Sequence, residues 1–419
     1  MNSFQKIEDV AAKRLCTGCG NCAFASLGKI KMVESKDENR RPKTVLPLNQ
    51  EELEKVQHYC PALNYEAKSL PATTFLEKAW GPVLEVWEGY ATDPVIRFQA
   101  SSGGAITALS FFMMDTGKCD GTLHIKARKD IPYLNESSYS STLKELREGC
   151  GSRYAPASVC DRLDLVENRK NPSVVVGKPC EIKALNQASS HSALLKDKLG
   201  LTISIFCAGV PSHKGTEALL KSLKPRINST NLNSLKYRGE GWPGNMVAAW
   251  NTITGKSHER AVSYESGWGD ILQKHRQWRC HICEDHTGEW ADISVGDPWQ
   301  NPTSETEKGK SLIVIRTEKA RVLFHEAIRK GYIRAEQKKS DILFKAQPNL
   351  FATKGAVFGR ILAMKFMGLA APKLSAASFI CWLNLPFKQK GQSIFGTVKR
   401  IYTRKLYLPK VLREMKGAN

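Results

Sequence analysis

The sequence predicts an α/β protein in three parts: a small cysteine-rich N-terminal domain, a larger mixed α/β body and a basic helical C-terminal tail. A chain of 419 residues exceeds what a single hydrophobic core usually supports, so two or three domains are expected. Strand-like and helix-like segments interleave through the middle of the chain, which is typical of an α/β sheet. Two prolines between Lys68 and Pro82 mark a linker. We therefore expect domains at 1–67 and 83–348, with the tail at 349–419.

Apolar runs and amphipathic patterns give the elements of the body in order along the chain. The expected strands are 121–127, 172–177, 201–206 and 313–316, and the expected helices are Ser102–Asp115, Glu181–Ala188, His213–Leu223 and Glu318–Lys330. This order divides the body into an N-terminal part (83–165) and a C-terminal part (166–348). No G-x-G-x-x-G motif follows an expected strand, so a Rossmann dinucleotide site is not supported.

Three of the twelve cysteines stand close together near the N-terminus, in the motif CTGCGNC. The first residues lack the apolar stretch of a secretory signal, so we expect a cytoplasmic location, where thiols stay reduced and can bind metal. Cys16, Cys19 and Cys22 can wrap three corners of an iron–sulfur cluster, and Cys60, which precedes a proline, supplies the fourth ligand as in half of a bacterial ferredoxin. Ser26 stands where the ferredoxin run has its own fourth cysteine. We therefore predict a ferredoxin-like [4Fe-4S] site.

Zinc is the alternative for these cysteines, since four thiolates also form a tetrahedral structural site. Zinc sites usually pair their ligands as two C-x-x-C knuckles, so the triple spacing favours iron–sulfur. A looser second set comprises Cys180, Cys207, Cys280 and Cys283, each at the end of an expected strand or in a loop. From spacing alone this set is equally a second cluster, a zinc site or a redox pair.

Two glycine-rich segments have a composition that suits cofactor binding. In SSGGAITAL, the turn Ser101–Gly104 runs into an expected helix, whose positive N-terminal end suits a phosphate or pyrophosphate. An ordinary helix N-cap explains the same residues. In GSRYAP, Arg153 and Tyr154 can stack on a cofactor or serve a structural role.

The tail carries more than half of the excess positive charge. Residues 351–419 hold thirteen Lys or Arg and a single acid, Glu414, and therefore +12 of the formal +21. Basic residues mixed with Phe, Trp and Leu suit the anionic inner face of a membrane, and a solvated basic helix packed on the body fits equally. No apolar run reaches the roughly 18 to 20 residues of a spanning helix. Nucleic acid is not an expected partner.

Eight segments follow one another between about residues 10 and 335: CTGCGNC, Cys60-Pro61, SSGGAITAL, GSRYAP, VVVGKPCEIKAL, FCAGVPS, YRGEGWPG and CHICEDHTGEWADISVGDPW. In this order they resemble the coenzyme F420 hydrogenase/dehydrogenase beta-subunit family, which is related to 7-hydroxymethyl chlorophyll a reductase. The basic tail lies outside the family core and resembles bacterial members that accompany surface-polysaccharide synthesis.

The resemblance implies a flavoprotein in which the α/β body binds FAD and [4Fe-4S] clusters relay single electrons. It also implies that the second cysteine set, Cys180, Cys207, Cys280 and Cys283, holds a second cluster. Asp292 and Asp297 become neighbours of the site. The residues implied near FAD are Ser101, Ser102, Gly103, Gly104, Arg153, Tyr154 and Lys178, the last of them close to the isoalloxazine.

The resulting hypothesis is an iron–sulfur flavoprotein oxidoreductase. It would pass electrons between a one-electron carrier, ferredoxin or another redox protein, and a two-electron small-molecule substrate such as a glycan precursor. The second hypothesis is an electron-transfer subunit that serves a partner enzyme, and the third is a zinc-bound scaffold. No catalytic acid or base stands out, because a lone histidine such as His124 or His213 is more often structural.

Overall fold

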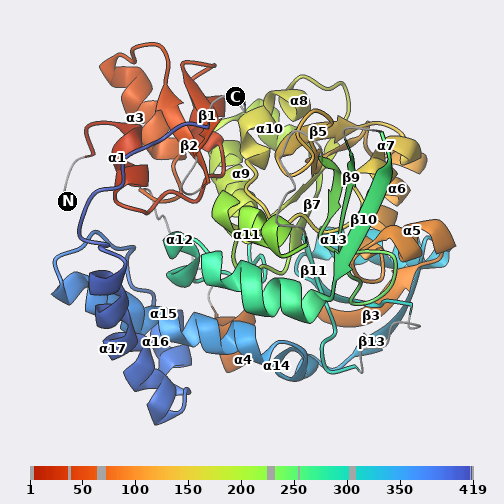
Figure 1. Cartoon of the computed structure of the whole chain (residues 1–419). Helices are drawn as coiled ribbons and strands as arrows, with labels where there is room; N and C mark the ends of the chain where they lie inside the picture. The colour runs from red at the N-terminus through yellow and green to blue at the C-terminus, as the bar shows by residue number, and fades with distance from the viewer. Residues whose placement is uncertain are drawn as a thin grey trace.

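The computed structural model describes residues 4–35, 39–63, 72–223, 232–252, 255–301, 308–415 and 417. Figure 1 shows a small N-terminal domain, drawn in red, against a large α/β body, with a group of blue C-terminal helices on the same side of the body.

The body is built on an eight-stranded mixed sheet with the order β13-β3-β12-β11-β7-β6-β4-β5. Its strands are β3 (Glu85–Ala91), β4 (Thr122–Ala127), β5 (Asn135–Ser140), β6 (Ser173–Gly177), β7 (Leu199–Ile205), β11 (Ile293–Gly296), β12 (Ser311–Ile315) and β13 (Ile333–Lys338). Strands β4, β6, β7 and β11 pair in parallel, and the remaining pairs are antiparallel. The α/β fold class predicted from the sequence is confirmed.

Burial explains which strands the sequence revealed. All five residues of β12 are buried, so this strand reads as the continuous apolar run of a sheet covered on both faces. The two edge strands, β5 and β13, are mostly polar, with sequences NESSYS and IRAEQK, and were not predicted. Strand β11 has only four residues, too few for a periodic signal.

The helices of the body cover the sheet and connect its strands. Helix α6 begins at Ala105 rather than at the predicted Ser102, because Gly104 at its N-cap takes a left-handed φ of +78° and ends a turn. Helix α11 has the predicted bounds. The helices are α4 (Phe75–Trp80), α5 (Pro94–Gln99), α6 (Ala105–Asp115), α7 (Leu143–Glu148), η1 (Val159–Arg162), α8 (Asp164–Glu167), α9 (Pro179–His191), α10 (Ala193–Asp197), α11 (His213–Leu223), η3 (Glu265–Ile271), η4 (Leu272–His275), α12 (Trp278–His281) and α13 (Glu318–Arg329).

A separate three-stranded antiparallel sheet lies beside the main one. It has the order β10-β9-β8 and comprises β8 (Leu232–Lys236), β9 (Met246–Asn251) and β10 (Ser257–Val262). Its buried residues Leu235 and Met246 pack with Leu219 of α11 and Leu272 of η4 in one apolar cluster. This small sheet is therefore fixed to the body through a core of its own.

The N-terminal domain shares its core with the body. It contains α1 (Ile7–Ala12), α2 (Asn21–Ala25), the hairpin β1 (Ile30–Glu34) and β2 (Arg40–Thr44), and α3 (Gln50–Tyr59). Its buried residues Val10 and Val56 belong to one hydrophobic cluster with Leu185 of α9 and Trp278 of α12. A shared core indicates that the domain is packed in one position on the body.

The predicted tail packs against both other parts of the protein. It forms α14 (Ile342–Ala346), α15 (Pro348–Phe366), α16 (Ala376–Leu383) and α17 (Phe387–Thr403). Val357 and Ile361 of α15 and Ile401 of α17 lie in the core cluster that contains Cys19 and Cys22. None of the helices in the described part of the chain has both the length and the apolar character that crossing a membrane requires.

The last described residues, which we call the C-terminal strap (405–415), return to the N-terminal domain, and Figure 1 shows the C-terminus beside β1. The backbone N–H of Met415 donates to the Glu34 carbonyl over 2.9 Å, and the N–H of Lys410 donates to the Ala12 carbonyl over 2.9 Å. Arg14 donates to the carbonyl of Leu408 over 2.7 Å. Removing residues 351–419 would thus expose the core of the N-terminal domain.

Candidate functional site

A central cavity of about 230 Å³ opens where the parallel strands β6, β7 and β11 end. In open α/β sheets, ligands bind outside the carboxyl ends of the strands. Of the residues implied near FAD, six line this cavity: Ser101, Ser102, Gly104, Arg153, Tyr154 and Lys178. Asp297, the first residue after β11, lines it as well.

Gly103, the remaining member of that set, packs between two strands. A Cβ atom there would lie 2.5 Å from the carbonyl oxygen of Gly89 and 2.6 Å from the backbone nitrogen of Ser311. Its neighbour Ser102 donates from Oγ to the Lys310 carbonyl over 2.7 Å. These contacts seat the glycine-rich turn on β3 and β12 and direct the N-terminal end of α6 toward the cavity.

A second cavity of about 490 Å³, which we call the trough, adjoins the first. The two share the lining residues 149–153 and Arg238. Lys126 and Lys129 line the trough, and cations of this kind suit a pyrophosphate. Together the two cavities fall in the range of about 300 to 1,000 Å³ that is usual for cofactor sites.

Arg153 serves the structure through its guanidinium. Its Nε donates to Asn135 over 2.7 Å, its Nη1 donates to the Leu235 carbonyl over 2.6 Å, and its Nη2 donates to the Pro132 carbonyl over 2.7 Å. The side chain therefore joins β5 to β8. Its partner in the motif, Tyr154, packs on Trp268 with ring centres 5.0 Å apart.

Lys178 is a buried cation at the boundary between the central cavity and the second cysteine set. It forms an ion pair with Glu181, one turn further along α9. Burial is the largest influence on this group and works against its charge, but Glu181 together with Cys180 and Cys207 raises the pKa of the ammonium. Lys178 therefore holds a positive charge at the cavity wall two residues before Cys180.

The second cysteine set surrounds one small cavity of about 30 Å³, which we call the inner site. Cys180 follows β6, Cys207 follows β7, and Cys280 and Cys283 come from α12 and the residues after it. Burial raises the pKa of the Cys207 thiol to about 12 and that of Cys283 to about 11. Four cysteines from three segments that are distant in sequence thus meet at one point.

The N-terminal cysteines surround a second small cavity of about 20 Å³, the outer site, which Cys16, Cys19, Cys22 and Cys60 all line. Burial raises the pKa of the Cys19 thiol to about 11 and that of Cys60 to about 12. Among the described residues, no group of three or more His, Cys, Asp or Glu is arranged to hold a single metal ion. At both sites the four thiols enclose a void, and four cysteine ligands are the usual donors of a [4Fe-4S] cluster.

The central cavity, the inner site and the outer site follow one another through neighbouring residues. Lys178 lines the central cavity and Cys180 lines the inner site. Likewise, Phe206 lines the central cavity and the next residue, Cys207, lines the inner site. Thr17 lines both the inner and the outer site. The three sites therefore form a row in which each is separated from the next by about one layer of residues.

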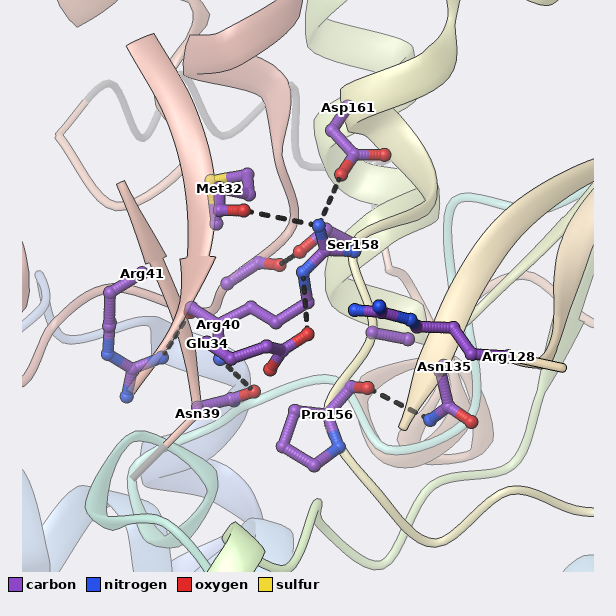
Figure 2. A network of polar contacts seen from close by, with 12 residues as sticks. Met32, Glu34, Asn39, Arg40, Arg41, Arg128, Asn135, Pro156, Ser158 and Asp161 are labelled. Atoms are coloured by element: carbon purple, nitrogen blue, oxygen red, sulfur yellow. Dashed lines mark hydrogen bonds and ion pairs between the residues drawn. The ribbon is translucent and has the colours of Figure 1, made fainter. Parts of the chain in front are cut away.

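A buried polar network fixes the outer site to the body (Figure 2). Arg40 of β2 pairs with Glu34 over 3.2 Å and with Asp161 of η1 over 3.1 Å. Ser158 Oγ donates to the Gly18 carbonyl over 2.6 Å, and the N–H of Cys160 donates to the Cys19 carbonyl over 3.0 Å. The last two bonds hold the loop that carries Cys16, Cys19 and Cys22.

The same hairpin reaches the inner site. Arg41 Nη2 donates to Gln277 Oε1 over 3.0 Å, and Gln277 lines the inner site. His213 pairs with Glu34 over 2.7 Å, which gives this histidine a structural role at the domain boundary. The relative position of the two cysteine sites is therefore set by bonds from both strands of the hairpin.

The two aspartates flanking β11 lie at opposite ends of that strand. Asp292, before the strand, accepts from the N–H and hydroxyl of Thr202 over 2.9 Å and is a strand-end residue away from the cavity. Asp297, after it, forms a bidentate pair with Arg238 at 2.8 and 2.9 Å. Arg238 is buried and lines the central cavity, although it was not singled out from the sequence. Its position within the motif YRGEGWPG was the one sequence signal that could have identified Arg238 as a site residue.

Two sequence-family models match the chain, and both describe the beta subunit of coenzyme F420 hydrogenase/dehydrogenase. Residues 86–164 match the model of its N-terminal part, and residues 172–341 match the model of its C-terminal part. These ranges contain the central cavity residues and the four cysteines of the inner site.

Curated relatives agree with these matches. An uncharacterised protein of Methanocaldococcus jannaschii is 26% identical over 282 residues, 65% of this chain and 70% of that protein. The coenzyme F420 hydrogenase subunit beta of Methanosarcina barkeri is 24% identical over 253 residues, 58% of this chain and 77% of that protein. The F420-dependent formate dehydrogenase subunit beta of M. jannaschii is 25% identical over 247 residues, 59% of this chain and 60% of that protein.

Among solved structures, a chain of the F420-reducing [NiFe] hydrogenase complex from Methanosarcina barkeri has a similar fold. The TM-score is 0.54 at 19% sequence identity, and the match covers 71% of this chain and 98% of that chain.

Proposed function

This chain belongs to the coenzyme F420 hydrogenase/dehydrogenase beta-subunit family, as the sequence motifs predicted, and on this premise we propose that it is an iron–sulfur flavoprotein oxidoreductase. It would pass electrons between a one-electron carrier and a two-electron small-molecule substrate. The observation that carries this proposal is the row of the central cavity, the inner site and the outer site.

The donor sets support two [4Fe-4S] clusters, one at each cysteine site. Each site offers four buried or half-buried free thiols around a void. A zinc scaffold is less consistent with this arrangement, because a single zinc ion draws its four sulfurs to about 2.3 Å and fills the space between them.

The central cavity and the trough support FAD. The end of α6 and the glycine-rich turn offer backbone N–H groups, and Lys126 and Lys129 offer charge, at the wall suited to a pyrophosphate. When bound, the flavin supplies exchange between one-electron and hydride chemistry, and the clusters supply single-electron transfer. Lys178 would hold positive charge beside the isoalloxazine, and the Arg238–Asp297 pair would close the opposite wall against water.

A second candidate function is that of an electron-transfer subunit for a partner enzyme. The names of two relatives, each a subunit beta, favour it. In that case ferredoxin or another redox protein would dock near the outer site, and the substrate would belong to the partner.

We also propose that the tail contacts an anionic membrane surface through one face of α17. Phe387, Phe395 and Tyr402 on this helix are 89%, 76% and 59% exposed. At 100° per residue they lie, together with Lys388 and Lys399, within about one third of the helix circumference. Exposed aromatic rings among lysines suit the headgroup region of an anionic bilayer. A glycan precursor at that surface remains the predicted substrate class.

Anaerobic purification tests the proposed function. We expect about eight irons, from two [4Fe-4S] clusters, and one FAD per chain. Zinc in place of iron, or a chain without flavin, would overturn the proposal. Turnover of candidate acceptors by the reduced protein alone would favour the oxidoreductase, whereas turnover only in the presence of a partner protein would favour the electron-transfer role.

A further inference from the structure

A groove of about 970 Å³ runs between the body and the C-terminal helices. The lining residues that the C-terminal helices contribute lie beyond residue 341, where the family match ends. We call it the basic groove. Arg276 contributes from the body, Arg360 from α15 and Arg400 from α17. The first turn of α15, at Pro348 and Asn349, lines the same space.

The three arginines make few contacts with protein acceptors. Arg276 donates to the Ala208 carbonyl over 2.9 Å and, from Nε, to the Gln273 carbonyl over 3.3 Å. Arg360 donates to the His281 carbonyl over 2.7 Å, and Arg400 has one long bond of 3.4 Å to Thr397. A guanidinium has five N–H donors, so most of the donors of these three side chains have no acceptor among the described residues.

Two of these guanidinium groups also have buried atoms without a hydrogen-bond partner. They are Nε of Arg360 and Nε of Arg400. Leaving a buried donor unsatisfied is costly, so the two arginines are held beside the groove against an energetic penalty that no protein acceptor in the described part of the chain offsets.

The charges in the groove are poorly balanced. Burial and then the nearby Arg400 and Arg276 lower the pKa of Arg360 to about 10. Glu265, which is exposed, is the one carboxylate among the described residues that line the groove, and no ion pair with these arginines is formed within the described part of the chain. Like charges held together without a counter-charge destabilise the fold, and a bound anion would reverse the effect.

The opposite wall of the groove is aromatic. Tyr264 and Trp299 stack with ring centres 5.4 Å apart, and Trp268 lies beside them along the groove. Arg238, which lines the central cavity, lies over both stacked rings, at 4.8 and 5.4 Å from their centres. One layer of side chains therefore separates the groove from the central cavity, and Arg276 borders the inner site through Ala208.

We propose that the basic groove is a binding site for an organic phosphate or diphosphate, with the phosphate on Arg276, Arg360 and Arg400 and the organic part against Tyr264 and Trp299. Arginine forks match phosphate oxygens in geometry as well as charge. The N-terminal end of α15 adds favourable partial charge. The site stands independently of the proposed clusters and flavin.

Isothermal titration of the purified full chain with inorganic pyrophosphate, and then with ADP, tests this site. Arg360→Gln and Arg400→Gln should each raise the Kd of pyrophosphate by about ten-fold, the effect of one charge-assisted contact. ADP should additionally quench the fluorescence of Trp268 and Trp299. The control Lys365→Gln removes the same charge from an exposed position on α15 and should leave Kd unchanged.

Thermal unfolding separates binding from folding. Because the arginines repel one another, each Gln variant without ligand should melt at the same temperature as the parent or above it. At equal pyrophosphate concentration the parent should gain more stability than either variant. No pyrophosphate binding by the parent, or equal Kd values in all variants, would overturn the proposal. Iron and flavin contents would stay normal in that event, so its failure is distinguishable from failure of the proposed function.

Vesicles distinguish a free phosphate from a lipid headgroup. We would compare phosphatidylcholine vesicles with and without phosphatidic acid, using the parent, Arg360→Gln and Phe395→Ser. Binding that is lost in Arg360→Gln assigns a headgroup to the groove. If only Phe395→Ser loses vesicle binding, and the parent does not bind pyrophosphate, then the exposed face of α17 recognises the phosphatidic acid and the groove is excluded.

Discussion

The outer and inner cysteine sites have the same four donors but are assembled differently. The outer site takes three cysteines from one loop, Cys16 to Cys22, and the fourth is Cys60. The inner site takes its cysteines from Cys180, Cys207 and the Cys280–Cys283 pair, across more than a hundred residues. A local loop can form its site once it is anchored, whereas the inner site requires β6 and β7 to end at the same edge of the sheet.

The two sites depend on different parts of the fold. The outer site depends on how the N-terminal domain is held to the body, through Arg40 and the bonds of Ser158 and Cys160. The inner site depends on the sheet and lies between the other two. Loss of the inner site should therefore interrupt electron transfer between the outer site and the central cavity. Loss of the outer site should leave electron transfer between the inner site and the central cavity possible.

The largest expected effect comes from removing one ligand at each site. Cys207→Ala should slow reduction of the flavin by a one-electron donor at the outer site by more than about 100-fold, since even second-shell changes at metal sites cost about 10 to 100-fold. Stopped-flow absorbance measures the rate. Cys22→Ala should spare the inner cluster, and each variant should retain about half the iron.

Flavin reduction at the parental rate in Cys207→Ala would contradict the proposed place of the inner site between the other two, because electrons would then reach the flavin without it. Retention of FAD in both variants is the necessary control.

The next effect tests the anchoring of the outer site. Arg40→Met removes the cation that pairs with buried Glu34 and Asp161, and breaking a buried pair from one side typically costs about 3 to 5 kcal/mol. Urea unfolding measures this loss. The matched control, Arg162→Met, breaks the exposed pair with Asp164 and should cost no more than about 1 kcal/mol. Equal losses would show that the network does not anchor the domain.

Two glycines test how closely the N-terminal cysteine loop packs on the body. Gly20 and Gly28 have left-handed φ values of +95° and +89°, so alanine is strained at both by about 1 to 2 kcal/mol. A Cβ at Gly20 would also lie 2.5 Å from the Asp161 backbone nitrogen, whereas nothing lies within 4 Å at Gly28. Gly20→Ala should therefore destabilise the protein by about 1 to 3 kcal/mol more, the usual cost of overpacking. Similar urea midpoints for both variants would contradict close docking of the loop.

The smallest effect is a pH dependence of the body. Burial lowers the pKa of His124 in the folded state, so below its ordinary value near 6.5 the unfolded chain binds more protons than the folded one. Stability should consequently fall as pH drops below 6.5 toward the lowered value. His124→Gln should weaken this dependence in urea titrations at pH 7.5 and 5.5. An unchanged slope in the variant would assign it to other groups.

Part of this arrangement could be predicted from the sequence. The outer cysteines form a local motif, β12 reads as a continuous apolar run, and α11 has a clear helical periodicity. Spacing alone left the inner set undecided, because its geometry depends on the order of strands in the sheet. The resemblance supplied that assignment, and the structure gathers the same four thiols around one cavity.

Other features were outside the reach of sequence patterns. Nothing local distinguishes Arg153, whose guanidinium donates to Asn135 and three carbonyls, from an arginine that contacts a ligand. The packing of α15 and the return of the C-terminal strap to β1 depend on long-range contacts. The same holds for the basic groove, since its arginines come from three separate elements.

The central claim, a row of cofactors with the inner cluster in the middle, is tested most directly by low-temperature electron paramagnetic resonance of the fully reduced protein. The account predicts a spectrum of two magnetically coupled [4Fe-4S] clusters that becomes a single uncoupled signal in Cys22→Ala and a different single signal in Cys207→Ala. A parental spectrum equal to the sum of the two variant spectra, or the absence of any cluster signal from an iron-replete protein, would contradict it.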